Sequence, residues 1–299
     1  PAAPSTLRPY QRVAPAPSAQ TMSDFRKLLQ SGSKPLVMMG GGGWTAKACE
    51  DMLRFARANN LPLSTSFRCQ DLIDNDDPNY AGHVGIGPSK VLADLVREAD
   101  PLIVVGPRLG EMTTSGYTLV TAPVPMQRMV HVHPGAEELG RVYQADLLIN
   151  SGMPEFASAL VNMPPVDATA WKGLVEHAHA ADQAERTPTP TSDQLDMAQV
   201  VLQLQARLGK DVIVTNGAGN YSGWAHRYWR YGGFRSQLGP TSGAMGYGLP
   251  AAVAAKLQAP DRTVVCFAGD GCFLMSGQEL ATARQYGARI LVLVVNNSS

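Results

Sequence analysis

The sequence predicts an α/β protein with two doubly wound parallel-sheet (Rossmann-like) domains, the second of them truncated at its C-terminus. Short apolar runs of strand length alternate with stretches of helix length, on both sides of a segment rich in Pro, Thr and Ala (residues 163–192). Strands that alternate with helices form parallel sheets. A chain of 299 residues has room for two ordinary domains. We therefore expect a linker (1–20), a first domain (21–162), a linker with a short helix (163–192) and a second domain (193–299).

The composition is that of a soluble globular protein, with 44 % hydrophobic and 17 % charged residues. The 25 basic residues balance the 25 acidic ones, so we expect neither nucleic acid nor a membrane surface as a partner. No apolar run approaches the roughly 20 residues that span a bilayer. The four cysteines form no CxxC pair, which indicates reduced thiols and a cytoplasmic protein.

The first domain is expected to follow an extended connector, because residues 1–20 hold five prolines together with alanine and serine. Its first strand, at 35–39, runs directly into four consecutive glycines, Gly40 to Gly43. The expected helices are 22–29, 46–59 and 89–98, and the expected strands are 35–39, one that starts at Pro62, 102–105, 129–133 and 147–149.

The second domain repeats this alternation after a short helix at 170–184. A capping box, Ser276 to Glu279, is expected to open the helix at 278–286. The chain stops after an apolar strand, where a parallel sheet normally continues into a covering helix, so we expect a fragment of a longer protein. The expected helices are 196–208, 248–257 and 278–286, and the expected strands are 212–214, 263–268 and 290–295.

Polar side chains follow the last two of these strands. Asp270 comes directly after the strand at 263–268, and Asn297 lies 27 positions further on, after the strand at 290–295. The carboxyl ends of neighbouring parallel strands meet at one edge of a sheet, so both side chains should face one crevice. Carboxylate and carboxamide oxygens suit Mg²⁺ bound together with a polyphosphate. Gly271 lets the backbone approach such a group, and the amides of Gly271 and Cys272 are free to donate to it. The alternative is that both side chains only satisfy the amides of their own turns.

A second candidate segment is the glycine-rich turn from Thr215 to Asn220, which follows the strand at 212–214. Ligands in open α/β sheets bind at the carboxyl ends of strands. Such turns are common in proteins, so the turn alone does not identify a ligand.

Together these segments resemble the diphosphate-binding motif of thiamine-diphosphate enzymes. The stretch Thr241 to Pro250, which contains Gly243-Ala244-Met245, is similar to the acetolactate-synthase-like branch of that family. The resemblance implies thiamine diphosphate and Mg²⁺ as cofactors. It assigns the metal to Asp270, Asn297 and the backbone carbonyl of Ser299, and it assigns cofactor contacts to Asn216, Gly217, Ala218, Gly243, Met245, Gly269, Gly271 and Cys272.

Met245 has the most specific role in this resemblance. It would wedge between the two rings of the cofactor, while the Gly243 carbonyl accepts a hydrogen bond from the pyrimidine amino group. A flexible thioether suits an irregular gap of this kind. The alternative is that Met245 packs the core at the start of a helix.

The activity that the resemblance implies is decarboxylation of a 2-oxo acid, followed by transfer or ligation of the acyl carbanion to a carbonyl acceptor. A decarboxylase or an oxidase of another 2-oxo acid shares the same motifs. The catalytic glutamate of the family belongs to a domain that no segment here matches, so the chain by itself should be inactive. The family's cofactor lies between two subunits, which implies a homodimer or homotetramer.

Residues 21–162 resemble the family's middle domain, which carries FAD in acetolactate synthases and an adenine nucleotide or nothing in other relatives. Gly40 to Gly43 and Arg108 are candidates to face such a ligand, although the G-x-G-x-x-G order is missing. His131 and His133 share one face of a strand, without a third ligand spaced to complete a metal site. An aromatic segment from Trp224 to Tyr231 is expected either to line an entrance or an interface, or to pack in the core.

Two other classes of function remain open from the residues alone. A nicotinamide-dependent dehydrogenase would explain two Rossmann-like domains, but it requires a fingerprint turn and a ribose-binding carboxylate that the sequence does not show. A non-catalytic assembly module would keep the fold without the chemistry.

Overall fold

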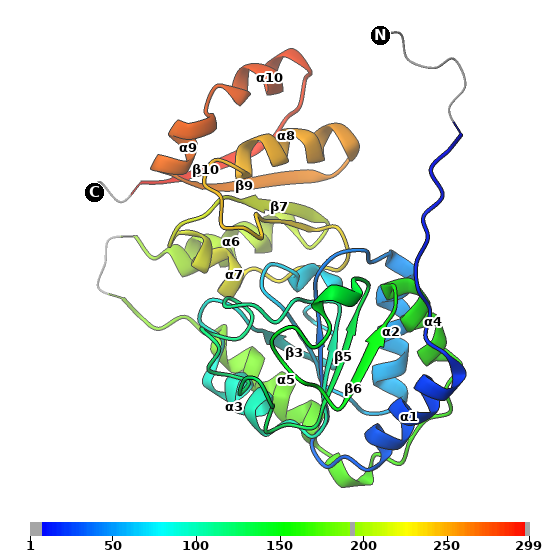
Figure 1. Ribbon diagram of the computed structural model, residues 1–299. Coiled ribbons are helices and arrows are strands. Elements are labelled where there is room, and N and C mark those ends of the chain that lie inside the picture. The colour runs from blue at the N-terminus through cyan, green and yellow to red at the C-terminus, as the bar shows by residue number, and fades with distance from the viewer. Residues whose placement is uncertain (1–7, 192–194, 297–299) are drawn as a thin grey trace.

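The computed structural model describes residues 8–191 and 195–296 and contains two parallel sheets, each with helices on its faces (Figure 1). The first sheet has six strands in the order β3-β2-β1-β4-β5-β6, and the second has four in the order β10-β9-β7-β8. The described pairs of neighbouring strands within these sheets are parallel. The predicted fold class, α/β with two doubly wound parallel sheets, is confirmed.

The first sheet is built from apolar strands that are buried on both faces. Every side chain of β1 (Leu36–Met39) and β4 (Leu102–Val105) is buried. A buried parallel strand needs apolar residues at all positions, because helices cover both faces of its sheet. The other strands are β2 (Leu63–Thr65), β3 (Tyr80–His83), β5 (Met129–His133) and β6 (Leu147–Asn150).

Two hydrophobic clusters lie on the two faces of this sheet. One includes Phe55 of α2 (Ala46–Ala58) and Phe156 of α4 (Met153–Val161). The other includes Leu92 and Val96 of α3 (Lys90–Glu98). The remaining helical elements up to residue 185 are α1 (Ala19–Gln30), α5 (Leu174–Glu185) and the 3₁₀ turns η1 (Gln70–Leu72), η2 (Ala136–Glu138) and η3 (Thr169–Trp171).

The second sheet also has a cluster on each face. Trp229 and Phe267 pack in the cluster that involves α6 (Met197–Leu208) and α7 (Ser222–Tyr228). Leu249 and Ala252 of α8 (Gly248–Gln258) pack on the opposite face. The other elements are β7 (Val212–Asn216), β8 (Gln237–Leu238), β9 (Thr263–Gly269), α9 (Asp270–Ser276), α10 (Glu279–Gln285) and β10 (Leu291–Val295).

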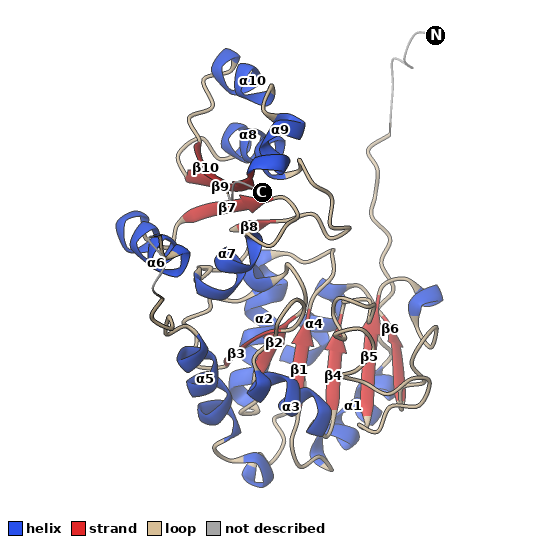
Figure 2. Cartoon of the chain, turned by 90° about the vertical axis from the view of Figure 1, so that its left-hand side faces the viewer, coloured by secondary structure: helices blue, strands red, loops and turns tan. Residues whose placement is uncertain are grey.

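The strands of the first sheet point with their carboxyl ends toward the second domain (Figure 2). The two domains meet in a junction formed by residues 68–77 and 230–240. Asp71 Oδ2 accepts hydrogen bonds from the backbone amides of Ser236 (3.1 Å) and Gln237 (3.2 Å). The Gln70 amide donates to Gln237 Oε1 at 2.9 Å. These contacts fix the loop after β2 against the turn that leads into β8.

Several boundaries differ from the sequence prediction. The first helix begins at Ala19 because the Ser18 side chain accepts from the Thr21 amide, so the connector is shorter than 1–20. The expected helix at 170–184 is interrupted at Gly173, which has φ +83°, and α5 then packs against β3 and α3. The part of this segment that forms α5 therefore packs on the first domain.

The predicted capping box is wrong. Ser276 is the last residue of α9, and its buried hydroxyl has no hydrogen-bond partner. The helix α10 begins at Glu279 without a side-chain cap. Sequence analysis also did not identify β3, α4, α7, β8 or α9 as separate elements.

Candidate functional site at the strand ends

The carboxyl ends of β9 and β10 lie side by side, as the spacing of Asp270 and Asn297 predicts. Gly269 pairs with Val295 in the parallel register of these strands, so Asp270 follows one strand end directly. Asn297 and Ser299 lie outside the described residues, and their proposed metal contacts stay predictions.

The connections of the second sheet reverse direction beside the same place. From β7 the chain first adds β8 on one side and then crosses to add β9 on the other side. Open α/β sheets bind ligands outside the carboxyl ends of strands at such a switch point.

A cavity of about 320 Å³ lies at this edge of the sheet, and we call it the strand-end cavity. It gathers the predicted residues Ala218, Met245, Gly269, Asp270, Gly271 and Cys272, together with Gly219, Asn220, Tyr221, Trp224 and Val295. These residues come from the ends of three strands and from the turn before α8. Six of the nine predicted site positions within the described residues thus line one cavity.

The residues after β9 form the start of a helix rather than the predicted loop. Asp270 is the first residue of α9 and partly exposed at the cavity. The amides of Gly271 and Cys272 belong to the first turn, where a helix supplies no backbone acceptor for them. They therefore remain available as donors, as the sequence predicts.

Met245 lies against this turn. A Cβ atom on Gly271 would come within 3.3 Å of Met245 Cε. The absence of a side chain at Gly271 therefore makes room for the thioether of Met245. Met245 is 47 % exposed, which rules out the alternative that it packs in the core. Its side chain borders the strand-end cavity instead.

Tyr221 connects the two turns that enclose the cavity, and sequence analysis missed it. Its hydroxyl accepts from the Gly217 amide at 3.0 Å and donates to Cys272 Sγ at 3.3 Å. The Cys272 thiol donates in turn to the Ala218 carbonyl at 3.0 Å. Burial and the neighbouring Cys272 raise the pKa of Tyr221, so its hydroxyl stays a neutral hydrogen-bonding group.

Gly269 is required by the same tyrosine, because a Cβ atom there would lie 2.8 Å from the Tyr221 ring. The only sequence signal for Tyr221 was its place directly after the glycine-rich turn.

Three predicted cofactor contacts lie outside the lining of the strand-end cavity. Asn216 is fully buried, and its Nδ2 donates to the Gly217 carbonyl at 2.6 Å. Gly217 is buried beneath the turn. Gly243 lines a neighbouring cavity that shares Ala218, Gly219 and Asn220 with the strand-end cavity. Asn216 and Gly217 are therefore buried residues that support the turn and do not line the strand-end cavity.

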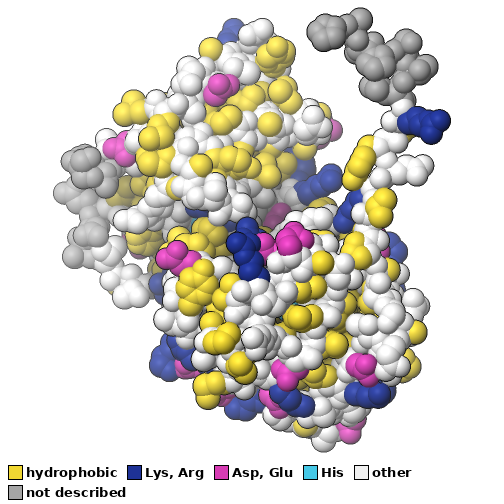
Figure 3. All heavy atoms as spheres, viewed as in Figure 1, with side chains coloured by type: hydrophobic (Ala, Val, Ile, Leu, Met, Phe, Trp, Pro, Cys, Tyr) yellow, Lys and Arg dark blue, Asp and Glu magenta, His cyan; other side chains and the backbone are white. Residues whose placement is uncertain are grey.

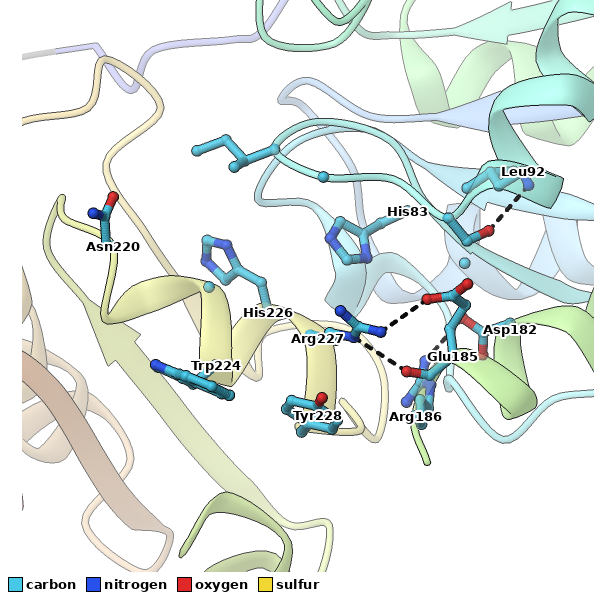
Figure 4. A pocket seen from close by; sticks show the side chains of 15 residues that line it. His83, Leu92, Asp182, Glu185, Arg186, Asn220, Trp224, His226, Arg227 and Tyr228 are labelled. Carbon is cyan, nitrogen blue, oxygen red and sulfur yellow. Dashed lines mark hydrogen bonds and ion pairs between the residues drawn. The ribbon is translucent and has the colours of Figure 1, made fainter. Parts of the chain in front are cut away.

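The aromatic segment from Trp224 to Tyr231 divides between cavity and core. Trp229 and Tyr231 are buried in the core of the second domain. Trp224 stacks on Tyr228, with ring centroids 6.1 Å apart, and both line a cavity of about 400 Å³ between the domains (Figure 4). Packing in the core thus holds for Trp229 and Tyr231, whereas an entrance or interface role of this segment stays a prediction.

Two histidines, His83 and His226, face each other across this interdomain cavity with ring centroids 6.4 Å apart. Burial lowers the pKa of His83 to about 4 and that of His226 to about 3, so both are neutral at pH 7. The charges in the cavity belong to close ion pairs, Arg186 with Asp182 and Arg227 with Glu185, each at 3.0 Å. Figure 4 shows the pair of Arg227 and Glu185.

The first domain offers less room for a nucleotide. Arg108 pairs with Glu138 at 3.0 Å and borders a cavity of about 140 Å³ together with His131. Ligand pockets usually reach roughly 300 Å³ or more, and binding of FAD by this domain stays a prediction. His131 is buried and bonded to the Pro107 carbonyl at 3.1 Å, and His133 bonds within its own turn.

Within residues 8–191 and 195–296, no three His, Cys, Asp or Glu side chains are grouped to hold a metal ion. No helix of the described chain is long and apolar enough to cross a membrane.

An open α/β domain with a cavity at its switch point is typical of ligand-binding proteins. Comparison with known protein families identifies the family to which this chain belongs. Residues 22–160 match the central domain of thiamine pyrophosphate enzymes, and residues 217–299 match their C-terminal TPP-binding domain. The chain belongs to the thiamine pyrophosphate enzyme family, and the resemblance noted in the sequence is confirmed.

Several curated relatives are large subunits of acetolactate synthase. The chain is 30 % identical to that of Parasynechococcus marenigrum, over 90 % of this chain and 44 % of the relative. It is 28 % identical to the isozyme 2 large subunit of Escherichia coli, over 91 % of this chain and 48 % of the relative. The sulfoacetaldehyde acetyltransferase of Alcaligenes xylosoxydans is 27 % identical, over 91 % of this chain and 50 % of the relative. The chain spans about half the length of these relatives.

Proposed function

We propose that the chain binds thiamine diphosphate through Mg²⁺ at the strand-end cavity and is part of an enzyme that decarboxylates a 2-oxo acid and transfers or ligates the resulting acyl group. The observation that carries the proposal is the convergence of Asp270, Gly271 and Met245 on one cavity, within a domain that belongs to the thiamine pyrophosphate family. A nicotinamide-dependent dehydrogenase explains none of these positions.

The residues of the cavity suit a diphosphate with a divalent cation. Asp270 supplies a carboxylate oxygen, which Mg²⁺ prefers as a ligand, and Asn297 and Ser299 would complete the metal's protein ligands. The amides of Gly271 and Cys272 would donate to the phosphate oxygens. Gly269 and Ala218 lack bulky side chains, which allows a close approach of the backbone.

Thiamine diphosphate, when bound, would supply the group that stabilises negative charge on the former carbonyl carbon as the 2-oxo acid loses CO₂. The chain's own contribution is to place and shield the cofactor. Met245, exposed at the cavity mouth, would support its rings. The bonds from Tyr221 to Gly217 and Cys272 keep the two turns at a fixed separation.

Transfer to a different acceptor is a second candidate, favoured by the likeness to sulfoacetaldehyde acetyltransferase. The enzyme of that name and acetolactate synthase are similar to this chain at nearly equal identity. The proposed function therefore includes both ligation and acyl transfer.

We also infer that the protein forms a homodimer or homotetramer and resides in the cytoplasm. Large apolar side chains are exposed next to the strand-end cavity, among them Leu274 (81 %) and Met275 (58 %) of α9. Figure 3 shows apolar atoms distributed over this part of the surface. A second subunit would remove them from water. The four cysteines are free thiols, which fits a reducing compartment.

Isothermal titration calorimetry with thiamine diphosphate and Mg²⁺ tests the proposal. Asp270→Ala should weaken binding by about 100-fold or more, because removal of even an outer-shell partner of a metal costs about 10- to 100-fold. The matched control is Asp261→Ala, an exposed carboxylate that precedes the same strand. Equal affinity of the wild-type chain and Asp270→Ala would contradict the proposal and favour a non-catalytic assembly module.

A further inference from the structure

A second cavity, of about 350 Å³, adjoins the strand-end cavity and is enclosed by both domains. We call it the junction cavity. The two cavities share Ala218, Gly219 and Asn220, so a ligand in the junction cavity lies next to a group bound at the strand ends. The junction cavity is lined by Phe67, Arg68, Ile86 and Met112 of the first domain, and by Ala218, Gly219, Asn220, Ser222, Gly223, His226, Thr241, Ser242 and Gly243 of the second.

Arg68 enters this cavity from the loop after β2 and is only 7 % exposed. Its Nη1 donates to the Pro240 carbonyl, and its Nη2 donates to the Gly217 carbonyl at 3.3 Å. The Nε atom is buried and has no partner. A Cβ atom at Gly239 would lie 2.9 Å from Arg68 Cδ, so the glycine makes room for this side chain.

Arg68 is a buried cation without a counter-ion among the described residues. Its hydrogen-bond acceptors are backbone carbonyls, and its guanidinium lies over the Phe67 ring, 4.6 Å from the ring centroid. Desolvation lowers the pKa of Arg68, but an arginine keeps its proton in proteins. An isolated buried charge is costly, and folded proteins normally pair it with an opposite charge.

The rest of the junction cavity adds no charge to oppose this cation. The residues that line it include no Asp or Glu. His226 is neutral, because burial lowers its pKa to about 3. The cavity therefore carries one net positive charge on its wall, beside apolar side chains such as Phe67 and Ile86 and hydroxyls such as Ser222.

Arg230 is a second arginine at the same junction, and its surroundings differ from those of Arg68. It crosses between the domains as Arg68 does, but it forms an ion pair with Asp76 and donates to the Asn75 carbonyl. It does not line the junction cavity. The missing acid at Arg68 is therefore a local property of the cavity and not of the junction as a whole.

We propose that the junction cavity binds the carboxylate of a small 2-oxo acid and that Arg68 supplies the positive charge that recognises it. The carboxylate of the acid would provide the missing counter-ion for Arg68. The short apolar tail of the acid would contact Phe67, Ile86 and Met112, which line the same cavity. The proposal rests on the proposed function, because that function makes a 2-oxo acid the ligand beside the cofactor. Arg68 is thus a specificity residue contributed by the first domain.

The test measures binding to the cofactor-free chain, which contains all residues of the junction cavity. Ligand-observed NMR titrations use pyruvate and its uncharged analogue 2,3-butanedione, in which an acetyl group replaces the carboxylate. Arg68→Gln should weaken pyruvate binding by about 10- to 100-fold, the range of a charged hydrogen bond, and should leave butanedione nearly unchanged. Arg68→Lys keeps the charge but loses the planar donors. Its affinity for pyruvate should therefore lie between those of the wild-type chain and Arg68→Gln.

Two further variants separate the carboxylate site from an effect on stability and from the proposed cofactor site. Arg230→Gln should lower stability without changing the preference for pyruvate over butanedione. Asp270→Ala should weaken thiamine diphosphate binding by about 100-fold or more and leave pyruvate binding intact, so the two proposals can fail independently. Equal losses of both probes in Arg68→Gln, or no loss of either, would overturn the carboxylate site.

The wild-type chain provides a second measurement if Arg68→Gln does not fold. Pyruvate should then bind at least about 10-fold more tightly than butanedione, and added salt should reduce this ratio. Equal affinities of the two probes, or no binding of pyruvate, would overturn the proposal.

Discussion

The two sheets of this protein are built from similar strands, yet they differ in how completely they are buried. In the first sheet, all side chains of β1 and β4 are buried. In the second, the edge strand β10 exposes Leu291 (43 %) and Val294 (45 %), although its sequence is as apolar as that of β4. Burial is therefore a property of the surrounding layers and not of the strand sequence.

The two domains also differ in the side chains around their sheets. The first domain places large side chains such as Phe25 and Phe156 in a continuous core. The second domain has smaller clusters and presents glycines, small polar residues and exposed apolar side chains around the strand-end cavity. Segments that bind ligands are commonly drawn from the less stable part of a structure.

The largest expected effect contrasts a buried side chain that packs on the first sheet with a partly buried side chain of the second sheet. Phe156 is fully buried and meets Phe25 edge-on, with ring centroids 5.7 Å apart. Phe156→Ala should lower the free energy of unfolding by about 3–5 kcal/mol. Leu293 of β10 is only partly buried, and Leu293→Ala should cost about 1–2 kcal/mol because less apolar area is lost. Urea denaturation measures both, and equal losses would show that the second sheet is as well packed as the first.

The junction between the domains should make stability depend on pH through Asp71. Burial raises the pKa of this carboxyl to about 6, although it accepts amides from Ser236 and Gln237. Because the folded pKa lies above the unfolded value of 3.8, the folded state binds more protons between about pH 4 and 6. Stability should therefore fall as pH rises through this window, by about 3 kcal/mol in total.

Asp71→Asn keeps an acceptor for both amides and removes the titration. The urea midpoint of Asp71→Asn should stay constant between about pH 4 and 6, whereas the midpoint of the wild-type chain should decrease. A decline of the same size in both would assign the pH dependence to other groups.

The smallest expected effect concerns a surface ion pair of the first domain. Lys34 and Glu98 lie 2.8 Å apart, but their side chains are 55 % and 59 % exposed. Glu98→Gln should change the free energy of unfolding by less than about 0.5 kcal/mol, because water and salt screen an exposed pair. A loss comparable to that of Phe156→Ala would show that surface charge, and not the core, stabilises the first domain.

The sequence predicted those parts of the fold that have strong local patterns. Apolar runs located β1, β4, β5, β9 and β10, because each is a continuous buried or half-buried stretch. The strand β3 has the sequence Tyr-Ala-Gly-His, in which the glycine weakens the pattern, and β8 contains only two residues. Neither has a local signal that distinguishes it from a loop.

The candidate site likewise contains residues that the sequence predicted and residues that only the structure reveals. Asp270, Gly271 and Met245 belong to short motifs, and all three border the strand-end cavity. Arg68 contacts a carbonyl 149 positions away, and Tyr221 contacts a thiol 51 positions away. Such contacts depend on the tertiary fold and leave no pattern in the neighbouring sequence. Asn216 was assigned to the cofactor from its place in a motif. The structure buries its side chain against the Gly217 carbonyl, and the cofactor contact stays a prediction.

A crystal structure of the protein with thiamine diphosphate and Mg²⁺ tests the central claim most directly. We expect the metal at about 2.0–2.1 Å from a carboxylate oxygen of Asp270, with the diphosphate on the first turn of α9 and the rings of the cofactor against Met245. Cofactor bound elsewhere, or a metal without Asp270 among its ligands, would contradict the proposed site.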